Sequence, residues 1–233
     1  MAYSRENPSE EYKSLSEQYR LLYSTEGSTL TNKIKLPPEK MFANGEYAKE
    51  APRIKRLMAK NDCRSIINFG CGNPDAFYTH RFVNEEVKIT IDGGGSKSPV
   101  YDSVYDFLGK PYVKMYDPGI KELSFYPDFP AEMVVCTDVL EHIPAQDIPW
   151  FLDELFKFTT KVLHVSIHLG PAVTVLPDGR NAHVCIRPRD WWRQEISRAE
   201  DRAGHQIHIS TVFRYPLDAN GDYTNINYDD YKN

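Results

Sequence analysis

A short apolar run that ends in two closely spaced glycines constrains the fold of this chain more than any other feature. Residues 65–69, Ser-Ile-Ile-Asn-Phe, are followed by Gly70, Cys71 and Gly72. The run is typical of a buried strand, and the glycines let the backbone turn sharply and approach a ligand without an intervening Cβ. Such turns follow strands in sheets that bind nucleoside cofactors, although glycine pairs also occur in turns that bind nothing.

The rest of the chain alternates between strand and helix patterns. We predict a first helix over residues 9–23. A second helix should begin near Ala51, with Pro52 in its first turn, and a third should begin after Asp147, which would be its N-cap. The predicted strands are Val87–Ile91, Tyr112–Tyr116, Met133–Thr137, Val162–Ile167, Gln206–Ile209 and Val212–Tyr215. Strands separated by helices imply parallel crossovers, so the predicted fold is α/β, with a doubly wound, mostly parallel Rossmann-like sheet and helices on both faces. A helical extension and loop would occupy 1–45, the Rossmann-like domain 46–217 and an irregular tail 218–233.

Composition and charge favour a soluble protein of the cytoplasm. Hydrophobic residues make up 41% and charged residues 26% of the 233 residues, and no apolar run approaches the roughly 20 residues of a membrane helix. The four cysteines lack Cys-x-x-Cys spacing, and the N-terminus has no apolar signal core. The net charge of −5 provides no basic field, so we expect neither a membrane nor a nucleic-acid partner. The sequence leaves the oligomeric state open.

A carboxylate at a second strand end would complete a nucleoside site, because it can accept hydrogen bonds from both ribose hydroxyls. Two residues compete for this role. Asp92 lies 20 residues after Gly72, the spacing of a simple strand-helix-strand unit, whereas Asp117 follows the predicted strand that ends at Tyr116.

Three segments together resemble class I S-adenosylmethionine-dependent methyltransferases. They are NFGCG at 68–72, YDPG at 116–119 and VVCTDVLEHIP at 134–144, and the likeness extends to LPDGRNAH at 176–183 and RPRDWW at 187–192. The resemblance implies S-adenosyl-L-methionine as cofactor and an insertion between the glycine turn and YDPG, which favours Asp117 over Asp92 and places Asp92 in a glycine-rich hairpin. The cofactor-binding residues that it implies are Asn68, Gly70, Cys71, Gly72, Asp117, Pro118, Thr137, Asp138 and Val139. The chain departs from the family pattern at Asn68, where an acid is usual, and at Pro74, where glycine is usual.

Histidines are the candidates for a base that accepts a proton during methyl transfer. His168, near the ligand-facing end of its strand, and His183 are the expected catalytic residues, whereas His164 suits a core position on the same strand. Glu141 and His142 have two interpretations: in some relatives of the family such a pair helps to hold a divalent metal, and more often it packs and sets the loop. We predict no metal, because the pair shows one carboxylate and one imidazole, and a hard cation needs about six oxygen-rich positions.

The loop around His183 has two interpretations. Together with Arg180, Arg187 and Trp191 it could close over an anionic or ring-shaped acceptor. Alternatively these residues form turns and capping contacts, with Trp191 or Trp192 in the core.

The resemblance implies transfer of a methyl group to a small-molecule or glycan-like acceptor, with oxygen as the expected acceptor atom. One alternative is a non-catalytic module that binds S-adenosylmethionine or another nucleoside, motivated by Asn68 and Pro74. A dinucleotide-dependent oxidoreductase is disfavoured because residue 75 is aspartate, which breaks the Gly-x-Gly-x-x-Gly pattern.

Overall fold

The computed structural model describes residues 3–23, 28–30, 35–36, 45–86, 89–91, 95–216 and 225–232. Its centre is a six-stranded sheet with the strand order β13-β12-β10-β9-β3-β8. The strands are β3 (Ser65–Phe69), β8 (Tyr112–Tyr116), β9 (Ala131–Thr137), β10 (Thr159–His168), β12 (His208–Arg214) and β13 (Ile226–Lys232). All neighbouring pairs are parallel except β12 with β13, which is antiparallel. The predicted α/β architecture with a mostly parallel sheet is confirmed.

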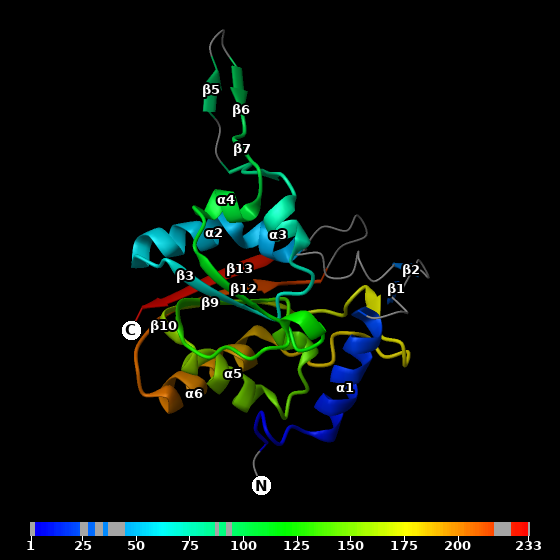
Figure 1. The fold of residues 1–233 in the computed structure, drawn as a ribbon. Coiled ribbons are helices and arrows are strands. Elements are labelled where there is room, and N and C mark those ends of the chain that lie inside the picture. Colours follow the sequence, from blue (N-terminus) through cyan, green and yellow to red (C-terminus); the bar gives the residue numbers. More distant parts are fainter. Residues whose placement is uncertain are drawn as a thin grey trace.

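Helices cover both faces of the sheet (Figure 1). On one face lie α2 (Gly45–Asn61), α3 (Asp75–Thr79) and α4 (Val104–Leu108), and on the other lie α5 (Ile148–Lys157) and α6 (Arg189–Ala203). Because successive strand residues point to opposite faces, Ile66 packs into the core beneath α2 and α4, whereas Ile67 packs beneath α5 and α6. The sequences of the parallel strands are therefore continuous apolar runs, which is typical of parallel strands whose two faces are both buried.

Helix α2 begins six residues before its predicted start, so Pro52 lies inside the helix and not in its first turn. Proline removes one helical hydrogen bond, which usually favours a helix boundary nearby. Here the buried stripe of Tyr47, Ala51, Ile54 and Met58 has helical spacing and continues through the proline. The packing of this stripe against the sheet therefore outweighs the preference of Pro52 for a helix boundary.

The two predicted closing strands are one strand, β12, which runs unbroken through Ser210 and Thr211. These polar residues suggested an interruption, yet both are buried. Arg53 Nε donates to Ser210 Oγ at 3.1 Å, and Thr211 Oγ1 donates to the Asp229 carbonyl at 3.4 Å. A strand tolerates buried hydroxyls when they are hydrogen-bonded in this way.

The predicted irregular tail contains β13, which pairs with β12 along seven residues. The polar composition of β13 did not indicate a strand, because its aspartates form ion pairs with helices on both faces of the sheet. Asp230 pairs with Arg53 of α2 at 2.5 Å, while Asp229 pairs with Arg189 and Arg193 of α6. The sequence pattern also missed α6, whose buried residues Trp192, Glu195, Ile196 and Ala199 have helical spacing.

Smaller elements surround this core. The predicted N-terminal helix is present as α1 (Glu10–Leu21). Within the predicted loop 24–45, β1 (Ser28–Leu30) and β2 (Lys35–Leu36) form a small antiparallel sheet with β11 (Thr174–Val175). The remaining elements are β4 (Phe82–Val83), β7 (Val100–Tyr101), η3 (Lys121–Leu123) and η4 (Leu140–His142). Among the described helices, none is long and apolar enough to span a bilayer.

The predicted strand Val87–Ile91 does not join the central sheet. Residues 87 and 88 lie outside the described part, and β5 (Ile89–Ile91) pairs with β6 (Gly95–Lys97) as a separate antiparallel hairpin. Figure 1 shows this hairpin projecting from the domain beyond α4. The segment between the glycine turn and YDPG therefore contains a hairpin that lies outside the central sheet.

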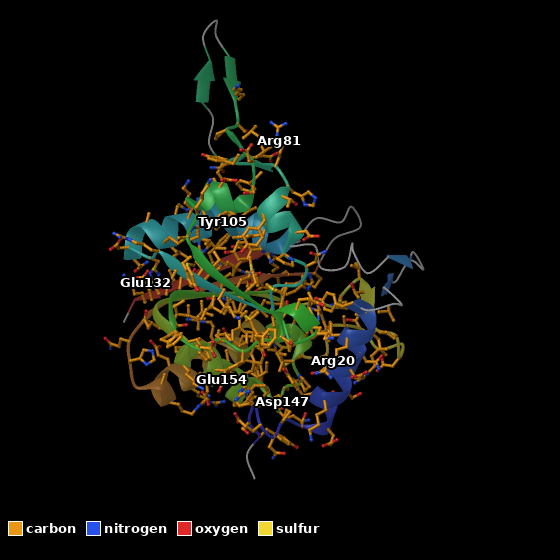
Figure 2. The ribbon with its side chains drawn as sticks, viewed as in Figure 1. Arg20, Arg81, Tyr105, Glu132, Asp147 and Glu154 are labelled. Carbon is orange, nitrogen blue, oxygen red and sulfur yellow. The ribbon has the colours of Figure 1, made fainter. Side chains whose placement is uncertain are left out.

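Glu132, labelled in Figure 2, lies near the start of β9 and holds three groups together. Its Oε2 accepts from the backbone N–H groups of Arg64 and Ser65 at 2.6 and 3.2 Å, and Lys161 Nζ lies 2.8 Å from Oε1. The hydrogen bond from Lys161 and those from the two N–H groups lower the pKa of Glu132 to about 2.

Because the folded-state pKa of Glu132 lies below its ordinary value, this carboxylate stabilises the fold above about pH 4.5, and the stabilisation is lost as the pH falls toward 2. We expect the Glu132→Gln variant to lose less stability than the wild type between about pH 6 and pH 3. Urea unfolding at both pH values measures this difference. Glu122→Gln, at an exposed glutamate of η3, is the control; an equal pH dependence in wild type and Glu132→Gln would contradict the prediction.

Candidate functional site

A cavity of about 320 Å³ lies where β3, β8 and β9 end. The chain at the end of each of these strands supplies three consecutive residues to the cavity wall, and α1 and α2 supply aromatic side chains. The lining residues are Tyr12, Leu15, Ser16, Tyr19, Tyr23, Tyr47, Gly70, Cys71, Gly72, Asp117, Pro118, Gly119, Thr137, Asp138, Val139, His142 and Ile143. Eight of the nine residues predicted to bind a cofactor thus surround one space.

The glycine turn after β3 has the conformation that its sequence predicted. Gly70 and Gly72 have φ values of 74° and 59°, in the left-handed region that glycine adopts most readily. A Cβ at Gly70 would lie 2.5 Å from Val139 Cγ2, so no larger residue fits there. The N–H groups of Gly70 and Cys71 both donate to the Tyr116 carbonyl, which joins this turn to the end of β8.

Asp117 links the turns that follow β3 and β8. Its Oδ2 accepts from the Gly72 N–H at 2.9 Å, and its Oδ1 accepts from the Gly119 N–H at 2.8 Å. Burial raises the pKa of Asp117, although these backbone N–H groups act in the opposite direction. The competing candidate, Asp92, lies outside the described residues.

Asn68 is the predicted cofactor residue that does not line the cavity. It is 1% exposed and, like Ile66, lies on the face of β3 that α2 and α4 cover. Its Nδ2 has no hydrogen-bond partner among the described residues. Pro74 is accommodated more simply, because it is the residue before the first turn of α3, where a missing N–H breaks no helical hydrogen bond.

The segment after β9 turns sharply at Asp138. This residue has a φ of 58°, in the left-handed region, and its N–H donates to the Ser166 carbonyl at 3.0 Å. The turn brings the Asp138 side chain to the cavity, and η4 then places His142 beside it. A non-glycine residue in this conformation is uncommon and carries a conformational cost.

Three histidines gather behind this segment. The ring centroids of His142 and His183 are 4.7 Å apart, and those of His168 and His183 are 5.0 Å apart. His142 lines the cavity, whereas the two predicted catalytic residues, His168 and His183, do not. Sequence reasoning had therefore named two of the three histidines as candidate bases, but neither their proximity nor the one that faces the cavity.

The two rings next to Asp138 have defined tautomers. His142 Nδ1 lies 2.9 Å from the Ala182 carbonyl oxygen, and His183 Nδ1 lies 2.6 Å from the Gly170 carbonyl oxygen. A carbonyl oxygen only accepts, so each Nδ1 carries the proton. Tyr19 Oη lies 2.6 Å from the same His142 Nδ1, which ties α1 to the cluster.

Charge is distributed unequally among the buried groups of this cluster. Burial lowers the pKa of His142 and lowers that of His183 to about 3, so both imidazoles are neutral near pH 7. Burial and the nearby Asp138 carboxylate raise the pKa of Glu141. Burial opposes ionisation of Asp138 as well, but the adjacent imidazoles of His142 and His183 outweigh it and lower its pKa. Asp138 is thus the charged carboxylate and Glu141 the neutral one.

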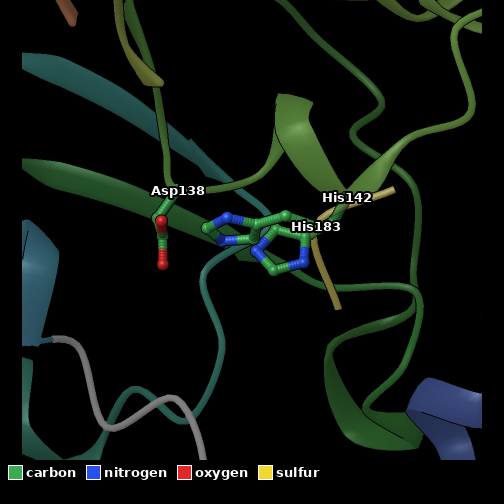
Figure 3. Close-up of side chains that lie close together, drawn as sticks. All are labelled: Asp138, His142 and His183. Carbon is green, nitrogen blue, oxygen red and sulfur yellow. The ribbon is translucent and has the colours of Figure 1, made fainter. Parts of the chain in front are cut away.

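The prediction of no metal considered Glu141 and His142 alone. The structure instead brings Asp138, His142 and His183 together, with one potential ligand atom from each lying within 4.8 Å of the others. Figure 3 shows the two imidazole rings side by side, with the Asp138 carboxylate next to them. His183 comes from a loop more than forty residues further along the chain, a proximity that local spacing does not reveal.

Helix α1 forms a wall of the cavity that the sequence did not suggest. Tyr12 and Tyr19 of the helix, and Tyr23 just after it, face the cavity. At its other end α1 is fixed by Asp147, which accepts from the Ser9 N–H at 3.0 Å and from Trp150 Nε1 at 2.8 Å. The only sequence signal was the tyrosine-rich stripe, which also suits ordinary packing.

The loop 176–183 packs on α1 and does not line the cavity. Arg180 pairs with Asp178 at 2.6 Å and donates to Ser14 Oγ at 3.1 Å. Asn181 Oδ1 accepts from the His183 N–H, which fixes the turn, and Trp192 is fully buried in the core. These contacts support the interpretation of this loop as turns with a core tryptophan.

A scan against protein-family models found no match for the chain, and a search of curated proteins found none either.

Proposed function

We propose that this protein is a methyltransferase that uses S-adenosylmethionine and methylates an oxygen of a small-molecule or glycan-like acceptor. One observation carries the proposal: three neighbouring parallel strands bring a glycine turn, a buried carboxylate and the Asp138 segment to a single cavity. Ligands of open α/β sheets bind in such crevices, outside the carboxyl ends of the strands. The same three segments carry the sequence resemblance to class I methyltransferases.

The groups around the cavity suit a nucleoside. Asp117 Oδ1 and Oδ2 each accept one backbone N–H, and a carboxylate oxygen can accept a second hydrogen bond, so both can also accept from a ribose hydroxyl. Gly70 and Gly72 offer backbone without a Cβ beside this carboxylate. Tyr12, Tyr19 and Tyr23 of the α1 wall supply aromatic surface for a planar base.

Bound S-adenosylmethionine would supply a methyl group that its sulfonium already activates, so this chain needs to position the acceptor and receive its proton. Asp138 and His142 are the groups of the cluster that face the cavity. Either can accept a hydrogen bond from an acceptor hydroxyl, because Asp138 is ionised and His142 is neutral near pH 7. His183 and His168 stand behind them, so we propose positioning roles for these two residues.

Calorimetry with S-adenosylmethionine is the first test, and we expect one binding site per chain. NADH fluorescence on the same preparation tests the oxidoreductase alternative. Tight binding of NADH with no binding of S-adenosylmethionine would overturn the proposal.

A second measurement separates an enzyme from the non-catalytic module that Asn68 and Pro74 suggest. The protein is incubated with methyl-labelled S-adenosylmethionine and pools of hydroxylated small molecules and oligosaccharides. We expect labelled product together with S-adenosylhomocysteine. Binding without any S-adenosylhomocysteine across these pools would favour the non-catalytic module.

A further inference from the structure

We propose that Asp138, His142 and His183 bind one divalent cation of the borderline class, such as Zn²⁺ or Co²⁺. One potential ligand atom from each of the three residues already lies within 4.8 Å of the other two. Ligand atoms around a tetrahedral Zn²⁺ with bonds of about 2.0–2.1 Å are about 3.3 Å apart. Side-chain rotation of two imidazoles and one carboxylate supplies the remaining movement.

The donor set selects the class of cation. Two imidazole nitrogens and one carboxylate suit zinc and the neighbouring first-row metals, whereas Mg²⁺ and Ca²⁺ prefer oxygen ligands. Three protein ligands leave at least one coordination position for water or a substrate oxygen, as in catalytic sites. Because Asp138 and His142 line the cavity, that position would face its interior.

The groups around the three residues orient them as a metal site requires. Both imidazoles donate from Nδ1 to backbone carbonyls, His142 to Ala182 and His183 to Gly170, which makes Nε2 the coordinating nitrogen of each ring. A ligating histidine usually donates its other N–H in this way, and such partners fix the orientation of the ring.

The backbone of the site is also braced. Asp138 directly follows β9, and His142 ends the turn η4. The Cys185 N–H donates to the Glu141 carbonyl at 2.9 Å, which joins the loop of His183 to the segment of His142. Because of this link, the third ligand is held next to the first two, although it is distant in sequence.

The cation site does not depend on the proposed function, but a role for the cation in methyl transfer rests on it. A cation that coordinated an acceptor hydroxyl would lower the pKa of that hydroxyl, and the alkoxide oxygen would form a bond to the methyl carbon as the bond from that carbon to sulfur breaks and S-adenosylhomocysteine leaves. With the cation bound, Asp138 and His142 would be its ligands and not the base, so the hydroxyl proton would pass to solvent. The acceptors that fit are those with a hydroxyl, or two adjacent hydroxyls, able to reach the open coordination position.

Metal titration of the full chain, without a polyhistidine tag and after dialysis against a chelator, tests the site. We expect one equivalent of Zn²⁺ by calorimetry and visible absorption bands when Co²⁺ is added. His142→Ala, His183→Ala and Asp138→Asn should each weaken the affinity at least tenfold. His205→Ala, at an exposed histidine just before β12, is the matched control and should bind as the wild type does.

Thermal unfolding with and without Zn²⁺ shows whether a variant has lost the metal site or has failed to fold. The cation should raise the Tm of the wild type and of His205→Ala, and it should not raise that of folded His183→Ala. Binding that is absent from the wild type, or retained in all three site variants, overturns the metal site. Metal binding without S-adenosylmethionine binding would overturn the proposed function alone, and the reverse result would overturn the metal site alone.

Discussion

Replacing Asp117 with alanine is expected to weaken the binding of S-adenosylhomocysteine by about 100-fold or more. A hydrogen bond to a charged group contributes about 1.5–3 kcal/mol, and two ribose hydroxyls would lose their acceptor together. A loss of about 3 kcal/mol corresponds to about a 100-fold change in Kd. The substitution also removes the acceptor of the Gly72 and Gly119 N–H groups, so the glycine turn should become less ordered.

Calorimetry with S-adenosylhomocysteine measures this effect, and thermal unfolding checks that each variant is folded. Asp92→Ala is the matched control, because Asp92 is the competing candidate for the same role. Its affinity should stay within about twofold of the wild type. A larger loss in Asp92→Ala than in Asp117→Ala would reverse the assignment of the ribose ligand.

Replacing Arg214 with methionine should lower the free energy of unfolding by about 3–5 kcal/mol. Arg214 and Glu50 form an ion pair beneath α2, and both side chains are almost fully buried. His164 Nε2 lies 3.4 Å from Glu50 Oε2, and Arg214 Nη1 donates to Ser166 Oγ at 3.2 Å. Without the guanidinium, the Glu50 carboxylate would remain in the core without the charge that compensates it.

Urea unfolding of Arg202→Met provides the comparison. Arg202 pairs with Asp153 at 2.7 Å on the surface, where the two side chains are 42% and 44% exposed. Loss of an exposed pair changes stability by less than about 1 kcal/mol. The double variant Glu50→Leu with Arg214→Met should recover part of the loss, because it removes the uncompensated charge. Equal effects of the two arginine substitutions would contradict this account of the buried pair.

The parts of the site that are local in sequence could be predicted from it. The turns after β3, β8 and β9 follow short apolar runs directly, and the ends of neighbouring parallel strands must meet at one edge of a sheet. The rule that ligands bind outside the carboxyl ends of such strands therefore placed Gly70 at the site, whereas the choice of Asp117 over Asp92 and the place of Asp138 came from the family resemblance. His164 was likewise correctly expected to be a core residue, because a mid-strand position faces the interior.

The parts that depend on distant contacts could not be predicted. Residues 226–232 become a strand because their acids meet arginines of α2 and α6, partners that are far away along the chain. Whether His142 or His183 faces the cavity depends on how the loop near residue 183 docks on η4. The cavity wall formed by Tyr19 depends on where α1 lies, which its amphipathic pattern leaves open. The spacing of apolar residues indicates which face of a helix or strand is buried, but it does not identify the element that packs against that face.

Because Asp138 has a left-handed backbone conformation, the stability of the fold and the function of the site favour different residues at this position. Glycine would adopt that conformation without the cost of about 1 kcal/mol that a side chain incurs there. A glycine would also remove the carboxylate that faces the cavity. Selection for a more stable fold and selection for an intact site would therefore favour different residues at position 138, and engineering that optimised thermal stability alone would tend to erase the site.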